Sequence, residues 1–152
     1  MSHPLAYANQ SLYHASILLS GWRAELERGS VPQNQVNQAY ASPVQTRLLD
    51  GYGWLLVAAC RIRQLPDSLP RSVSDLPPLP AGLVRPAEIE ACAQLEHSGW
   101  VAALRAPISD SSVVRRLDSL AVETGVNLEQ FEDWAQKLAG LAETVADAID
   151  ES

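Results

Sequence analysis

The stretch YANQSLYHASILLSGW, residues 7–22, contains no Asp, Glu, Lys or Arg and still has the pattern of an α-helix. Apolar residues recur through it and beyond it in alternating steps of three and four: Leu5, Ala8, Leu12, Ala15, Leu19, Trp22 and Leu26. This spacing aligns them as one stripe along a helix. Pro4 fits a first helical turn, and Gly29 fits the residue that follows a last turn. We therefore predict a helix over residues 5–28.

Uncharged polar side chains occupy a second row beside this stripe: Asn9, Tyr13, Ser16 and Ser20. A membrane-spanning helix is excluded, because such side chains would each need a hydrogen-bond partner in hydrocarbon. The small residues of the row would let a neighbouring helix approach closely, and this is the arrangement we expect. The alternatives are plain exposure to solvent or a pocket lined by Asn9, Gln10, Tyr13 and His14.

Apolar residues recur at helical spacing again between residues 32 and 63, which predicts a second helix. In LLDGYGWLLVAAC, residues 48–60, that helix would be apolar on nearly every side. A helix of that kind is buried centrally, and it is too short to span a bilayer, which needs about 20 residues. Pro43 lies inside the pattern and removes one backbone hydrogen bond, so the segment is either one kinked helix or two helices. Gly51 and Gly53 would permit close contact with neighbouring elements.

The rest of the chain contains further helices and one long connection. Residues 66–86 hold six prolines, so we predict a stiff, extended, proline-rich connection between helices. Beyond it we predict helices from about residue 86, over 99–106 with Ser98 as its cap, and over about 113–124. An acidic terminal helix follows at about 127–150, where Asn127 and Gln130 form a capping pair. Strand-type alternation is absent, so the fold class is all-α: one domain, residues 1–152, folded as a compact bundle of about five helices.

Charge is unevenly distributed along the sequence. The chain has a formal charge of −7, and residues 118–152 hold nine acidic residues against the single cation Lys137. A basic face for binding nucleic acid is not visible, so we expect no nucleic-acid partner and no membrane partner. A secretory signal is also not visible. Cys60 and Cys92 are isolated and are expected to be reduced thiols, so we predict a cytoplasmic location.

A set of short motifs carries a resemblance. The motif NQ-x-LY-x-A at residues 9–15 is followed by Trp22, by RQLP at residues 63–66, by the proline-rich connection and by SGW at residues 98–100. In order and spacing these motifs resemble a family of small uncharacterised gammaproteobacterial helical proteins, over about residues 5–106. No activity is established for that family, so the resemblance implies a helical fold in a bacterial cytoplasmic protein. The acidic helix from Asn127 departs from the family's pattern.

Motifs for catalysis or metal binding are missing from the sequence. Glu88, Cys92 and Glu96 share one face of a predicted helix, with His97 adjacent, but Cys92 equally suits an apolar core position. We expect no metal and no cofactor. The favoured function is a non-catalytic interaction protein that self-associates or binds another protein. The alternative is a small-molecule-binding protein or enzyme with a pocket between the first and middle helices, lined by Asn9, Tyr13, His14, Tyr52 and Trp54.

Opposite charges suggest how the acidic terminal helix is held. Four arginines flank or lie within the proline-rich connection: Arg61, Arg63, Arg71 and Arg85. We hypothesise that they attract the terminal helix and dock it onto the bundle, either within one chain or between two copies.

Overall fold

The structure is a computed structural model and describes residues 3–62, 64–79, 82, 84–108 and 127–151. Those residues form five α-helices and a short 3-10 helix, with no β-strand: α1 (Pro4–Arg28), α2 (Gln33–Ala59), η1 (Val73–Asp75), α3 (Ala87–Ser98), α4 (Trp100–Arg105) and α6 (Leu128–Asp150). The predicted all-α fold is confirmed. The helix predicted over about 113–124 lies outside the described residues.

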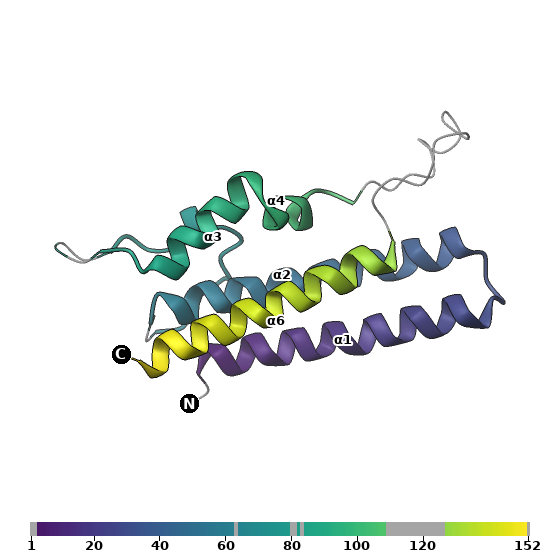
Figure 1. The fold of residues 1–152 in the computed structure, drawn as a ribbon, viewed down its shortest axis with the longest axis horizontal. Coiled ribbons are helices and arrows are strands. Elements are labelled where there is room, and N and C mark those ends of the chain that lie inside the picture. Colours follow the sequence, from purple (N-terminus) through teal and green to yellow (C-terminus); the bar gives the residue numbers. More distant parts are fainter. Residues whose placement is uncertain (1–2, 63, 80–81, 83, 109–126, 152) are drawn as a thin grey trace.

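Three long helices form the main body of the bundle. α1, α2 and α6 lie lengthwise against one another, while α3 and α4 pack beside α2 (Figure 1). α1 and α2 form an antiparallel hairpin whose loop begins at Gly29. Gly29 has a φ of 69°, a left-handed conformation that glycine adopts without steric cost. The helix predicted over residues 5–28 is therefore confirmed to within one residue.

α2 passes through Pro43 as one helix, so the predicted alternative of two helices is wrong. Pro43 lies on the solvent side, while Ala41 and Val44 on either side of it are buried in the core. Burial of these neighbours holds the helix together where one backbone hydrogen bond is missing. Farther along α2, a Cβ atom on Gly51 would lie 2.8 Å from Cδ2 of Leu12, so this glycine permits the predicted close helix contact.

α2 ends at Ala59, earlier than the predicted residue 63, because the chain turns there through Arg61. Arg61 has a φ of 56°, in the left-handed region that residues other than glycine rarely adopt. The N–H of Arg61 donates to the carbonyl of Ala58, and the N–H of Ile62 donates to the carbonyl of Val57. These two bonds form a Schellman motif, which satisfies carbonyls at the end of the helix.

α6 docks within the same chain, across both helices of the hairpin, through one apolar stripe. The buried members of that stripe are Leu128, Phe131, Trp134, Leu138, Ala142 and Val145. Phe131 contacts the rings of Trp22 and Trp134, at centroid distances of 5.4 and 4.9 Å. The indole N–H of Trp22 donates to the side-chain oxygen of Asn37 at 2.9 Å, so its polar atom is paired inside the core.

Among the connection's arginines that the structure describes, Arg61 contacts the acidic helix, whereas Arg71 and Arg85 pair with acids elsewhere. Docking between two copies stays a prediction. Arg61 donates to α6, but to the backbone carbonyl of Ala148, at 2.9 Å. The other two form ion pairs with acids outside α6: Arg71 with Asp50, and Arg85 with Glu90. Arg63 lies outside the described residues. The ion pair to α6 comes from Arg23 of α1, which binds Glu132, and exposed pairs of this kind contribute little to stability.

Candidate functional site

Three of the predicted pocket residues lie on the outer side of α1. Asn9 is exposed, and the side chain of Tyr13 is 64% exposed. The ring of Tyr13 lies near that of His14, with centroids 6.4 Å apart. These side chains therefore belong to a surface and not to the wall of an enclosed pocket.

Tyr52 and Trp54, the two predicted pocket residues on α2, lie elsewhere. Tyr52 is completely buried, and its hydroxyl donates to the carboxylate of Glu96 on α3. Trp54 is half-buried and stacks on Tyr7, with ring centroids 4.7 Å apart. α1 and α2 touch directly at Gly51. The structure therefore does not bring the five predicted residues together.

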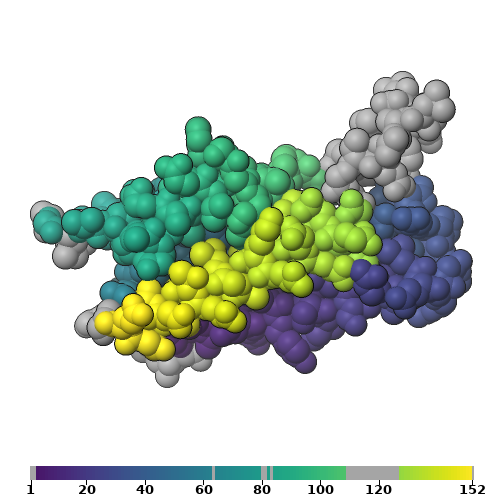
Figure 2. All heavy atoms as spheres, viewed as in Figure 1, coloured from purple at the N-terminus to yellow at the C-terminus, as the bar shows by residue number. Residues whose placement is uncertain are grey.

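The outer face of α1 is uncharged along most of the helix. Its exposed residues up to Ser20 are Ala6, Asn9, Gln10, Tyr13, Ser16, Ile17 and Ser20. Tyr13 and Ile17 are its large apolar side chains, 64% and 52% exposed. The close contact that we predicted for this row with another helix of the chain is absent among the described residues, because α2 and α6 cover the opposite, apolar side of α1. α1 is visible along the lower edge of the molecule in Figure 2.

A shallow groove of about 540 Å³ adjoins this outer face, between α1 and α6. The α1 side of the groove includes the small residues Ser16, Ser20 and Ala24. Arg23 and Glu132, which also line the groove, form the ion pair between the two helices. The small side chains leave room for side chains of a partner beside Tyr13 and Ile17.

A second hollow, the connection cavity, lies where the proline-rich connection meets the end of α2 and the beginning of α3. Its volume is about 300 Å³. Most of its lining is apolar: Val73, Leu76, Pro77, Pro78, Leu79 and Ile89. Cys60, Ser74 and Arg85 supply the polar groups. Among the lining residues that the structure describes, Arg85 alone is charged, and its side chain is 46% exposed.

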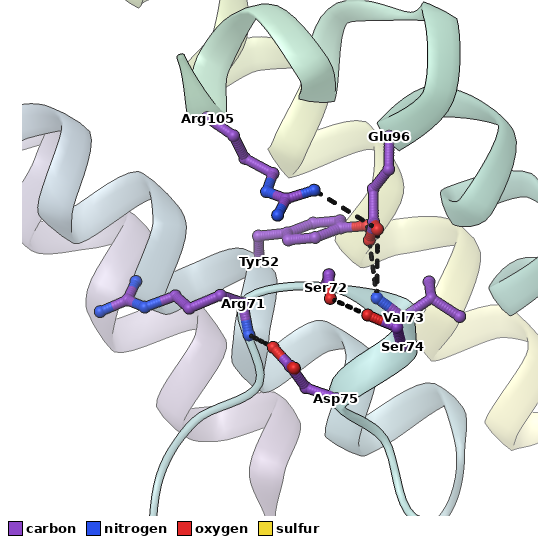
Figure 3. Close-up of polar contacts among 8 residues, drawn as sticks. All are labelled: Tyr52, Arg71, Ser72, Val73, Ser74, Asp75, Glu96 and Arg105. Carbon is purple, nitrogen blue, oxygen red and sulfur yellow. Dashed lines mark hydrogen bonds and ion pairs between the residues drawn. The ribbon is translucent and has the colours of Figure 1, made fainter. Parts of the chain in front are cut away.

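The carboxylate of Glu96 binds the backbone of Val73, one of the residues that line the connection cavity (Figure 3). It accepts hydrogen bonds from the hydroxyl of Tyr52 at 2.5 Å and from the N–H of Val73 at 2.9 Å. Arg105 of α4 approaches the same carboxylate at 3.6 Å. Because Val73 also lines the cavity, Glu96 ties the cavity wall to α2, α3 and α4 at once.

Two further contacts shape the connection near Val73, the residue that Glu96 binds. At Gly53 a Cβ atom would lie 2.6 Å from the carbonyl oxygen of Pro70, so the connection crosses α2 where a side chain is missing. The N–H of Arg71 donates to the carboxylate of Asp75 at 3.0 Å and closes the turn at η1 (Figure 3). The connection is thus anchored to the bundle in spite of its lack of regular structure.

The two cysteines near this region are protected thiols. Both are free, and burial raises the pKa of Cys92 to about 11. Burial also raises the pKa of Cys60, while the positive charge of Arg85 acts in the opposite direction. Thiolates are the reactive form of cysteine, so neither residue is activated as a nucleophile at neutral pH.

The shared face of Glu88, Cys92 and Glu96 does not assemble a metal site. The Glu96 carboxylate is occupied by the donors described above, and Cys92 is buried as a core residue. Within the described part of the chain, no three His, Cys, Asp or Glu side chains are grouped so that they could hold a metal ion.

Sequence reasoning missed the connection cavity and its residues, Cys60, Ser74 and Arg85 among them. One signal was present in DLPPLP, residues 75–80. A stiff, extended segment cannot fold back on itself, so its leucines cannot pack against one another. They must pack against a neighbouring surface, and where that packing is incomplete an apolar cavity remains beside the segment.

Comparisons with known proteins supply no relative. No protein-family model, curated protein or solved structure matches the chain significantly. The resemblance to gammaproteobacterial helical proteins stays a prediction. Among the described residues, no helix has both the length and the apolar character that crossing a membrane requires.

Proposed function

We propose that the protein is a non-catalytic, cytoplasmic interaction protein that self-associates through the outer face of α1. The observation that carries this proposal is the exposure of Tyr13 and Ile17 on a helix face without charged residues. Apolar side chains rimmed by polar ones are typical of protein–protein contact surfaces. The free thiols Cys60 and Cys92 support a reducing compartment.

The charge of the chain favours a second copy as the partner at this face. With a formal charge of −7, two copies repel each other over most of an approach. The outer face of α1 carries no charge between Ala6 and Ser20, so it is where two copies can meet without like-charge contacts.

An antiparallel pairing of two α1 helices would make this face self-complementary. In a two-fold dimer, residue i contacts residue j and j contacts i. If the axis passes midway between Tyr13 and Ile17, each Tyr13 meets the Ile17 of the second copy. The same register brings Gln10 opposite Ser20, a pair that can form a hydrogen bond, and the small Ala6 opposite Ala24.

The test is the oligomeric state of matched charge variants. Sedimentation equilibrium over a concentration series should show a monomer–dimer equilibrium for the wild type. Ile17→Glu should shift the protein to monomer, because dimerisation would bury two carboxylates. Val84→Glu is the matched control, because Val84 is 89% exposed and belongs to the connection rather than to α1, so this variant should still dimerise. A wild-type protein that stays monomeric, or an Ile17→Glu variant that dimerises normally, would contradict the proposal.

The register is tested by cross-linking in a Cys60→Ser background. Chains carrying Gln10→Cys should form a disulfide with chains carrying Ser20→Cys when the two are mixed under oxidising conditions. Each variant alone should cross-link poorly, because identical positions lie far apart in an antiparallel pair. Efficient cross-linking of each variant alone would indicate a parallel dimer and overturn the register.

A further inference from the structure

We propose that the connection cavity binds a small carboxylate with an apolar body, a property independent of self-association through α1. The cavity combines six apolar residues with one cation, and no carboxylate is found among its described lining residues. A ligand that matches this lining has one apolar part and one negative charge.

Arg85 is the residue that selects the negative charge. Its guanidinium fork matches the two oxygens of a carboxylate. Its partner in the structure, Glu90, is 3.5 Å away, and the side chains are 46% and 59% exposed. Such an exposed pair is weak, so the guanidinium can turn to a ligand at little cost. One cation on an acidic chain fits a monoanion better than a doubly charged phosphate.

The volume of the cavity sets the size of the ligand. A space of about 300 Å³ holds the equivalent of about ten water molecules, at about 30 Å³ for each. A carboxylate with about ten non-hydrogen atoms, such as octanoate, matches this size by the same arithmetic. Its chain would lie along the leucines and prolines of the connection, with Ile89 on the α3 side.

One part of the cavity wall is fixed to the bundle before any ligand arrives. Glu96 binds the N–H of Val73, and Gly53 contacts the backbone of Pro70, so the connection is anchored to the bundle around residues 70–73. A preformed site loses less conformational freedom on binding than a site that must fold around its ligand.

Cys60 provides a reporter inside the cavity, since it lines the cavity and is only half-buried. The rate of Cys60 alkylation by iodoacetamide is measured at one mildly alkaline pH, with peptide mapping to separate Cys60 from the buried Cys92. Octanoate is added below its micelle-forming concentration. At about ten times its Kd, it should slow alkylation of Cys60 about tenfold, because only unoccupied protein reacts.

The protection of Cys60 is compared with and without octanoate, between two arginine variants, and between octanoate and an uncharged analogue. Arg85→Gln should abolish most of the protection, whereas Arg28→Gln, a matched change at the far end of α1, should leave it intact. Octan-1-ol, which has the chain without the charge, should protect Cys60 much less than octanoate. The proposal is overturned if octanoate gives no protection, if Arg85→Gln is protected like the wild type, or if octan-1-ol protects equally.

Discussion

At the scale of single residues, Glu96 of the short helix α3 contacts three other parts of the structure: α2, the connection and α4. One carboxylate accepts from a buried tyrosine hydroxyl and from a backbone N–H of the connection. Its side chain is only 11% exposed, so water cannot readily replace it as the acceptor. A buried donor left without a partner loses the hydration that it had in the unfolded chain.

Replacing Glu96 by alanine should therefore lower the stability of the fold strongly. We expect Glu96→Ala to reduce the free energy of unfolding by about 2–5 kcal/mol, because two buried donors lose their acceptor. Glu96→Gln keeps an acceptor oxygen and should cost less. Glu90→Ala on the exposed side of α3 is the control and should stay within about 0.5 kcal/mol of the wild type. Urea denaturation measures all three, and equal effects of Glu96→Ala and Glu90→Ala would refute the role given to Glu96.

Cys92 should make stability depend on alkaline pH. Cys92 is 2% exposed, and burial raises the pKa of its thiol from 9.0 to about 11. Between these pH values the unfolded chain loses the proton while the folded chain keeps it, so stability falls as the pH rises. The thiol should contribute a slope of about 1.4 kcal/mol per pH unit. Urea unfolding between about pH 9 and 10 should give a shallower slope for Cys92→Ala, and identical slopes would contradict this prediction.

At the scale of elements, two glycines that look alike in the sequence have opposite roles. Gly53 in α2 faces the carbonyl of Pro70, whereas a Cβ atom on Gly140 in α6 would meet nothing within 4 Å. Gly53→Ala should therefore cost about 1–3 kcal/mol, because the added methyl must displace the connection. Gly140→Ala should stabilise the protein by about 0.5–1 kcal/mol, because alanine favours the helix. Thermal unfolding should show a lower melting temperature than the wild type for Gly53→Ala and a higher one for Gly140→Ala.

The periodic elements were predictable and the contacts between them were not. The steps of three and four in α1 and the cap at Asn127 are local, so the sequence alone predicts these helices well. The end of α2 was missed because it depends on Arg61 adopting a conformation that few arginines adopt. The connection cavity was missed because its lining comes from the end of α2, the connection and α3. Cys60 and Arg85 are far apart in the sequence, so no local sequence pattern predicts that they line the same cavity.

At the scale of the whole molecule, the docking of α6 should depend on apolar burial and hardly at all on charge. Leu138 is completely buried in the stripe of α6, so Leu138→Ala should cost about 2–5 kcal/mol. Arg23→Gln removes the exposed ion pair to Glu132 and should change stability little, with an effect that shrinks as salt screens the pair. Chemical denaturation at low and high salt tests this ranking, and a larger effect of Arg23→Gln would reverse it.

The buried hydrogen bond between Trp22 and Asn37 gives the molecule an internal reporter of opening. The indole proton of Trp22 lies beneath α6, bonded to an amide oxygen and in contact with Phe131. Exchange of that proton with deuterium requires that the packing among α1, α2 and α6 open, because Trp22 is fully buried and contacts both α2 and α6. Its exchange rate, read from a single indole resonance, therefore measures how often the packing around Trp22 opens to solvent.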